Sequence, residues 1–115
     1  MIAVIFEVII PGENMERYLE IAGGIRDELE KAEGFIYNER YKSITNPDKL
    51  LSFSLWESEE AVTKWRNQQK HREAQKKGRE EMFEDYRIRV TSVIRDYGMT
   101  DRDQVPEDSK EVHDR

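Results

Sequence analysis

The sequence has no cysteine, which excludes disulfide bonds, thiolate catalysis, zinc–thiolate sites and iron–sulfur clusters. It also has no apolar run of about 18 residues, so we expect no membrane-spanning helix. The chain enters an apolar segment without a basic leader or a small-residue cleavage site, so we expect no secretory signal. A cytoplasmic location fits these absences.

Positive charge is in the minority. The 19 Lys and Arg residues stand against 25 Asp and Glu residues, which gives a net charge of −6. This balance argues against non-specific nucleic-acid binding, which needs a basic surface, so we expect no nucleic-acid partner. The chain has only two histidines, far apart in sequence, and its carboxylates are scattered, so no metal site is predicted. No glycine-rich phosphate loop is present.

The pattern of apolar residues predicts four strands and two helices. Asn14 and Ser58 are the expected N-caps of the helices, and Asn46-Pro47-Asp48 is the expected turn of a hairpin. Gly23-Gly24, inside the first helix, predicts a close approach of this helix to a sheet or a kink. The predicted elements are strand 2–10, helix 15–32, strand 35–44, strand 50–56, helix 59–81 and strand 86–94.

This order of elements predicts a ferredoxin-like α+β fold, in which both helices cover one face of a four-stranded antiparallel sheet. The domain is expected to span residues 1–95, and residues 96–115 are expected to form an irregular, polar and acidic tail. Residues 2–10 are apolar on both faces of their strand. Because the helices cover only one face, we expect a second copy to cover the other and form a homodimer. The low apolar content, 37% against 38% charged residues, favours the same conclusion.

The segment LSFSLWESEEAVTKW, residues 51–65, followed by HREA at residues 71–74, resembles the antibiotic biosynthesis monooxygenase family of the dimeric α/β-barrel superfamily. The resemblance covers residues 2–95. It implies a protomer that pairs through its sheet and holds a ligand cavity between sheet and helices. Members of the family include cofactor-independent oxygenases of quinol-like aromatics, haem-degrading enzymes, isomerases and proteins without an assigned activity. Our leading expectation from the resemblance is an oxidoreductase that acts on a small aromatic or quinol-like compound, with dioxygen as co-substrate and no cofactor.

One branch of that family is disfavoured. Haem-degrading members carry an asparagine in the first strand and a histidine ten residues past the helical tryptophan. This sequence has no asparagine in its first strand, and Gln75 stands ten residues past Trp65.

Six residues are candidates for the site. The resemblance implies that Trp65 packs against an aromatic substrate. The alternative, to which we give equal weight, is that Trp65 is an ordinary core residue. His71 lies six residues past Trp65, about 120° around a continuous helix, so the two converge only if the helix breaks. We expect His71 to shuttle a proton, or else to fix a junction between two helical pieces. Arg72 or Arg40 is expected to stabilise an anion.

The other two candidates have strong structural alternatives. Trp56 ends a strand and either contacts substrate or belongs to the core or an interface. Glu7 is the one charge in an apolar strand, so it faces the cavity as a substrate-binding group or base, or it pairs with Arg87 or Arg89.

Two other functions stay open. One is a small-molecule-binding or stress-related protein that keeps the fold without catalysis. The other is an isomerase or lyase of a small polar metabolite, with the basic stretch 64–79 at the entrance to the cavity.

Overall fold

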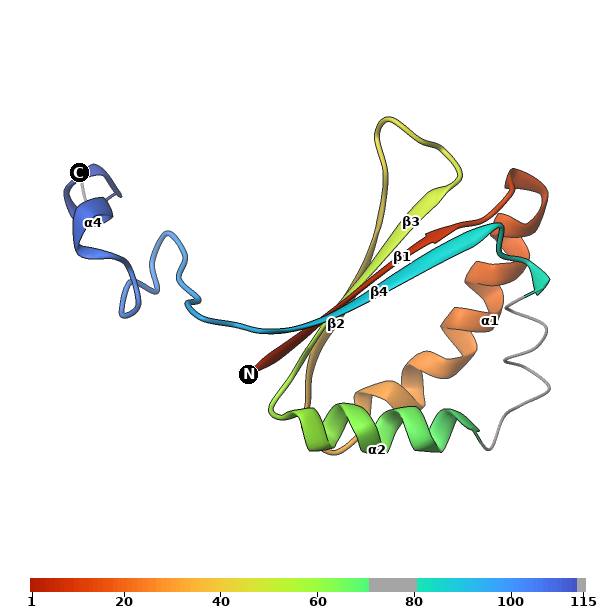
Figure 1. The fold of residues 1–115 in the computed structure, drawn as a ribbon, viewed down its shortest axis with the longest axis horizontal. Coiled ribbons are helices and arrows are strands. Elements are labelled where there is room, and N and C mark those ends of the chain that lie inside the picture. Colours follow the sequence, from red (N-terminus) through yellow and green to blue (C-terminus); the bar gives the residue numbers. More distant parts are fainter. Residues whose placement is uncertain (71–80, 114–115) are drawn as a thin grey trace.

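The computed structural model describes residues 1–70 and 81–113. A four-stranded antiparallel sheet carries two helices on one face (Figure 1). The expected ferredoxin-like α+β fold is confirmed. None of the helices in the described ranges is long and apolar enough to cross a membrane. The elements are β1 (Ile2–Ile9), α1 (Gly12–Glu30), β2 (Phe35–Lys42), β3 (Lys49–Trp56), α2 (Glu59–Lys70), β4 (Asp85–Ser92) and α4 (Glu107–His113).

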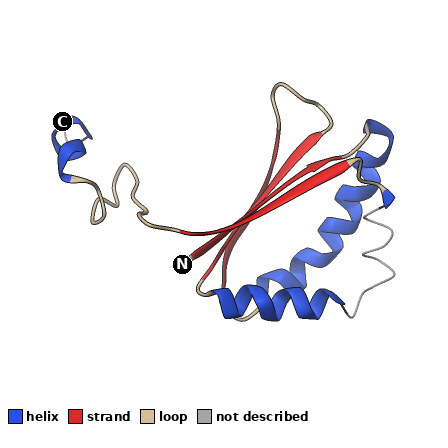
Figure 2. Ribbon diagram, in the orientation of Figure 1, coloured by secondary structure: helices blue, strands red, loops and turns tan. Residues whose placement is uncertain are grey.

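The sheet has the order β2-β3-β1-β4, and every neighbouring pair of strands is antiparallel. Side chains of a strand alternate between the two faces of the sheet. Even-numbered residues of β1, β3 and β4 face the helices, as Val8 and Trp56 show by being 1% and 2% exposed. In β2 the same holds from Asn38 on, whereas Phe35, before a register shift, packs against Trp56 on the helix face. Odd-numbered residues lie on the opposite face, which neither α1 nor α2 covers (Figure 2). We call this second surface the open face.

The helices are held on the sheet by two separate clusters of buried side chains. One cluster joins the end of β1 to the start of α1, and its members are Val8, Ile10, Met15, Tyr18, Leu50 and Met82. The other joins the end of β3 to the start of α2, and its members are Trp56, Ala61 and Val62. The core is therefore concentrated at two places on the sheet.

The two predicted N-caps have different outcomes. The Ser58 hydroxyl accepts a hydrogen bond from the Ala61 N–H at 3.2 Å, as expected for an N-cap. The prediction for Asn14 is wrong, because α1 begins at Gly12, directly after Pro11. The Asn14 side chain instead donates to the carbonyl of Met82 at 3.4 Å. Pro11 occupies the N-cap position, and because its side chain has no hydrogen-bond acceptor, α1 begins without a side-chain cap.

The expectation of a wholly irregular tail is also wrong. After β4 the chain extends away from the sheet and ends in α4 (Figure 1). The tail has contacts of its own: the Gln104 side chain accepts from the Asp96 N–H at 2.7 Å, and Val105 is 7% exposed. Acidic residues in the first turn, Glu107 and Asp108, favour a helix here because they complement its dipole.

Three glycines differ in the space around them. A β-carbon on Gly23 or Gly24 would have no neighbouring atom within 4 Å, so the expected close approach to the sheet is absent. A β-carbon on Gly34 would lie 2.5 Å from that of Ala61, and Gly34 has a φ of +78°. The glycine that this fold requires is therefore Gly34, at the entrance to β2.

We expect Gly23→Ala and Gly24→Ala each to raise the free energy of unfolding by about 0.5–1 kcal/mol, because alanine loses less backbone entropy in a helix. Gly34→Ala is expected to lower it by more than about 1 kcal/mol, because of its positive φ and the contact with Ala61. Urea denaturation followed by circular dichroism measures all three. A destabilised Gly23→Ala protein would show that the helix has a close neighbour at this position.

Candidate functional site

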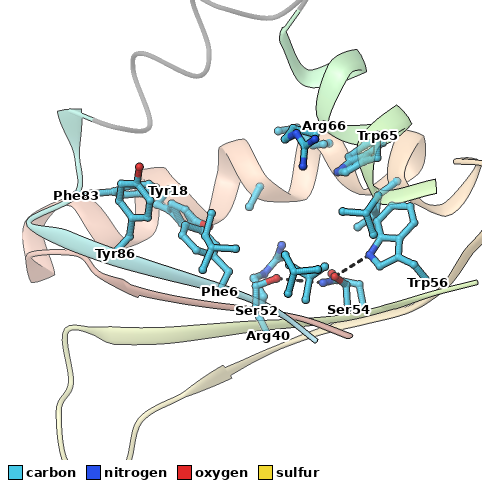
Figure 3. A pocket seen from close by; sticks show the side chains of 18 residues that line it. Phe6, Tyr18, Arg40, Ser52, Ser54, Trp56, Trp65, Arg66, Phe83 and Tyr86 are labelled. Atoms are coloured by element: carbon cyan, nitrogen blue, oxygen red, sulfur yellow. Dashed lines mark hydrogen bonds between the residues drawn. The ribbon is translucent and has the colours of Figure 1, made fainter. Parts of the chain in front are cut away.

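A cavity of about 420 Å³ lies between the sheet and the two helices (Figure 3). Its lining includes members of both core clusters, such as Tyr18 from one and Val62 from the other. The helices provide one side of the cavity, and the even-numbered residues of the strands provide the other. The two clusters thus hold the sheet and helices together while the space between them stays unfilled.

The part of the cavity over β1 and β4 is apolar. We call its strand residues the apolar floor; they are Val4, Phe6, Ile88 and Val90. Aromatic rings pack beside this floor: Phe6 lies 6.0 Å from Phe83 and 5.9 Å from Tyr86, measured between ring centroids. Ring contacts at these distances fix the side chains in place. This half of the cavity therefore offers a preformed apolar surface to a ligand.

The part over β2 and β3 is polar. We call its residues the polar floor; they are Asn38, Arg40, Ser52 and Ser54. Arg40 and Ser52 stand opposite each other in the ladder between β2 and β3, as do Asn38 and Ser54. The Asn38 amide donates to the Ser52 hydroxyl at 3.1 Å and to the Phe53 carbonyl at 3.2 Å. These bonds fix the geometry of the polar floor.

Asn38 also ties this floor to α1. Its side-chain oxygen accepts from Arg26 at 3.4 Å, and its main-chain carbonyl accepts from the same guanidinium at 3.3 Å. Asn38 is 7% exposed, so its polar atoms need such partners. Asn38 is thus fixed in place by its neighbours and positions the polar floor.

Two tryptophans lie at one end of the cavity, with ring centroids 6.2 Å apart. Trp56 is 2% exposed, and its indole N–H donates to the Ser54 hydroxyl at 3.0 Å. Trp65, on α2, is half-buried and presents its ring to the cavity (Figure 3). Trp56 is therefore both a core residue and part of the lining, whereas Trp65 is the more accessible aromatic surface.

The structure brings three of the six predicted site residues together at the cavity: Trp65, Trp56 and Arg40. Glu7 does not join them. It lies on the open face, where its carboxylate pairs with Lys49 and with Arg89, each at 3.5 Å. Pairing with Arg89 was the structural alternative for Glu7, and it is confirmed.

His71 and Arg72 lie outside the described residues. Their predicted roles stay predictions.

Among the polar lining residues, the sequence analysis did not identify Asn38, Ser52, Ser54 and Arg66 as site residues. The first three share the even parity of Val4 and Phe6, so the alternation of the strands held the signal that identifies them. Arg66 was counted within the basic stretch after residue 63, which hid its place beside Trp65 (Figure 3).

The described lining contains cations and hydroxyl groups but neither a carboxylate nor a histidine. The described residues also contain no cluster of side chains suited to hold a metal ion. The pKa shifts resolved within residues 1–70 and 81–113 belong to surface groups. A hydrogen bond from Lys64 lowers the pKa of Glu33. On the open face, Tyr37 donates to Glu39, which raises the pKa of Tyr37 and lowers that of Glu39.

The two tryptophans are expected to respond differently to truncation. Trp56→Ala should lower the free energy of unfolding by about 3–5 kcal/mol, because it removes a fully buried aromatic side chain. Trp65→Ala should lower the free energy of unfolding less, because part of the Trp65 ring is already exposed. Relative to this smaller loss of stability, it should weaken ligand binding more than Trp56→Ala does. Urea denaturation and calorimetric titration with an apolar ligand measure the two effects. Equal loss of stability in both variants would contradict this division of roles.

Solved structures share this fold. A protein from Mycobacterium tuberculosis superposes with a TM-score of 0.73 at 14% identity, covering 84% of this chain and 98% of that one. SnoaB from Streptomyces nogalater, a cofactor-independent oxygenase, superposes with a TM-score of 0.70 at 7% identity, covering 83% and 94%. At such low identities these similarities establish the fold alone.

Sequence comparison is more specific. A protein of Pyricularia oryzae named jasmonate monooxygenase ABM is 44% identical over 81% of this chain, which spans only 43% of that longer protein. The uncharacterized protein YqjZ of Bacillus subtilis is 31% identical over 81% of this chain and 79% of its own length. The sequence profile of the antibiotic biosynthesis monooxygenase family matches residues 1–77. This chain therefore belongs to the antibiotic biosynthesis monooxygenase family.

Proposed function

We propose that this protein is a cofactor-independent monooxygenase that oxidises a small, electron-rich aromatic or quinol-like compound. The observation that carries the proposal is the cavity, whose volume of about 420 Å³ suits such a ligand and whose lining is mostly apolar and aromatic. Trp65 offers the ring on which the substrate would stack. Membership of the monooxygenase family supports the reaction class.

The proposed reaction needs no external electrons. A base removes a proton from the activated CH₂ group of a quinol-like substrate, and the resulting carbanion reacts with dioxygen. One oxygen atom becomes the new carbonyl, and the other leaves as water with the two hydrogens of the CH₂ group. The substrate supplies all four electrons. The protein excludes water, orients the ring and stabilises the anion, a role that Arg40 can serve from the polar floor.

The name of the Pyricularia oryzae relative adds jasmonate to the candidate substrates. Hydroxylating a C–H bond that is not activated consumes two electrons from outside the substrate. Jasmonate is therefore tested with and without NADPH as reductant. Turnover that depends on NADPH would overturn the cofactor-independent mechanism and leave the monooxygenase class standing.

We expect the purified protein to consume dioxygen with an anthrone, which has the activated CH₂ group, above the rate in buffer and without added cofactor. An oxygen electrode and ¹⁸O₂ incorporation, followed by mass spectrometry, provide the measurements. Ligand binding without turnover would contradict the proposal and favour the non-catalytic binding protein.

We propose His71 as the proton shuttle of this reaction. His71→Ala is expected to lower kcat by about 10²- to 10⁴-fold, the usual contribution of general acid–base catalysis, and to leave ligand affinity unchanged. The pH profile of kcat should also lose the inflection that this histidine contributes. A parallel loss of affinity and thermal stability would instead indicate that His71 serves the structure.

We also propose that two copies pair through their open faces. At the centre of this face, Ile5, Leu51, Phe53 and Leu55 are apolar residues that are still partly exposed. Polar side chains flank them, including the hydrogen-bonded Tyr37 and Glu39. An apolar centre with a polar rim is typical of protein interfaces. The described tail, which could have covered this face, extends away from it instead (Figure 1).

We expect the wild-type protein to sediment as a dimer at micromolar concentration and Phe53→Glu to sediment as a monomer, because a charge would be buried at the centre of the interface. Ile44→Glu is the matched control, since Ile44 is fully exposed at the hairpin tip. A wild-type monomer with a folded circular-dichroism spectrum would refute the pairing.

A further inference from the structure

We infer that the cavity selects an apolar organic carboxylate, with the carboxylate on the polar floor beside Arg40 and the apolar body over the apolar floor. The inference deepens the proposed function and rests on the assignment of this cavity as the ligand site. Three observations support it: the polar floor has free hydrogen-bond donors, the lining carries positive charge, and the polar and apolar floors lie on different strands.

The polar floor offers hydrogen-bond donors. The Ser52 hydroxyl accepts from the Asn38 amide, and the Ser54 hydroxyl accepts from the Trp56 indole N–H. Amide NH₂ and indole N–H groups only donate, so each serine proton stays available for another acceptor. Within the described part of the chain, no acceptor for either serine proton is found. Two hydroxyl donors therefore face the cavity.

Arg40 adds a charged donor to the polar floor, beside Ser52 (Figure 3). It is half-buried, and a guanidinium stays protonated at any physiological pH. Within residues 1–70 and 81–113, Arg40 has neither an ion pair nor a side-chain hydrogen bond. A half-buried guanidinium without an anionic partner can still bind an anion, and a carboxylate would compensate its charge with two parallel hydrogen bonds.

The charge of the lining reinforces the argument. The protein as a whole carries a net charge of −6, yet the described lining has two cations, Arg40 and Arg66, and no carboxylate. Arg66 lies on α2, across the cavity from the strand that carries Arg40 (Figure 3). A positive cavity in an acidic protein attracts and retains anions.

The two floors also fix the orientation of the ligand. The polar floor belongs to β2 and β3, and the apolar floor belongs to β1 and β4, which lie side by side in the order β2-β3-β1-β4. A ligand that is charged at one end and apolar at the other can satisfy both at once. A neutral hydrocarbon would leave the donors without acceptors, and a small polar anion would leave the apolar floor uncovered.

Calorimetric titration with 4-phenylbutyrate and with 4-phenyl-1-butanol tests the inference, since the two probes differ mainly in the carboxylate. We expect the acid to bind the wild-type protein at least about 10-fold more tightly than the alcohol. Arg40→Met should weaken binding of the acid about 10- to 100-fold and leave the alcohol unchanged. Arg40→Lys should recover only part of the loss, because lysine cannot form the two parallel bonds.

Arg17→Met is the matched control, because it removes the same charge from an exposed position of α1 outside the lining. It should bind the acid as the wild-type protein does. Equal affinity for acid and alcohol, a full loss in Arg17→Met, or no binding of either probe would overturn the inference. Oxygenation of a neutral quinol in the same preparations would leave the proposed function intact, so the two can fail separately.

Discussion

The structure depends on where the chain places its few apolar side chains. Charged residues are about as numerous as hydrophobic ones, and the buried side chains do not fill the whole layer between sheet and helices. The buried side chains gather instead in two clusters, one at the start of α1 and one at the start of α2. Each cluster fixes one helix to the sheet. The volume between the clusters remains as the cavity, so the distribution of the core creates the site.

The chemistry of the site follows from which strands line it. Polar residues at even positions of β2 and β3 make one half of the floor, and apolar residues at even positions of β1 and β4 make the other. Hydrogen bonds among Asn38, Ser52 and Arg26 hold the polar half rigid before any ligand arrives. Such preorganisation lets a site recognise a ligand without first reorganising its own groups.

The sequence was sufficient to predict the fold, because strong alternation and glycine or proline breaks marked each strand. It also placed Trp65 and Arg40 at the site. Glu7 was the ambiguous case: its charge among apolar neighbours required a partner, but only the register shows that odd positions face away from the helices. Asn38 and the two serines were missed because polar residues in a strand are usually read as solvent-facing.

The starts of α1 and α4 show a different limit. Asn14 had the residue type of an N-cap, but a proline three residues earlier already began the helix. In the tail, Pro106 and its polar neighbours were read as irregular, although a proline followed by acidic residues also suits a helix start. Local patterns of this kind have two readings, and contacts elsewhere in the chain decide between them.

The close approach of Gly34 to Ala61 restricts substitution where β2 begins beside α2. A β-carbon on Gly34 would lie 2.5 Å from that of Ala61, so residue 34 cannot be enlarged without a shift of its neighbours. At the other side, Ile88 and Val90 of the edge strand β4 are about half exposed and tolerate larger or smaller side chains. Relatives that accommodate bulkier molecules are therefore expected to differ along β4 and to keep a glycine at the position of Gly34.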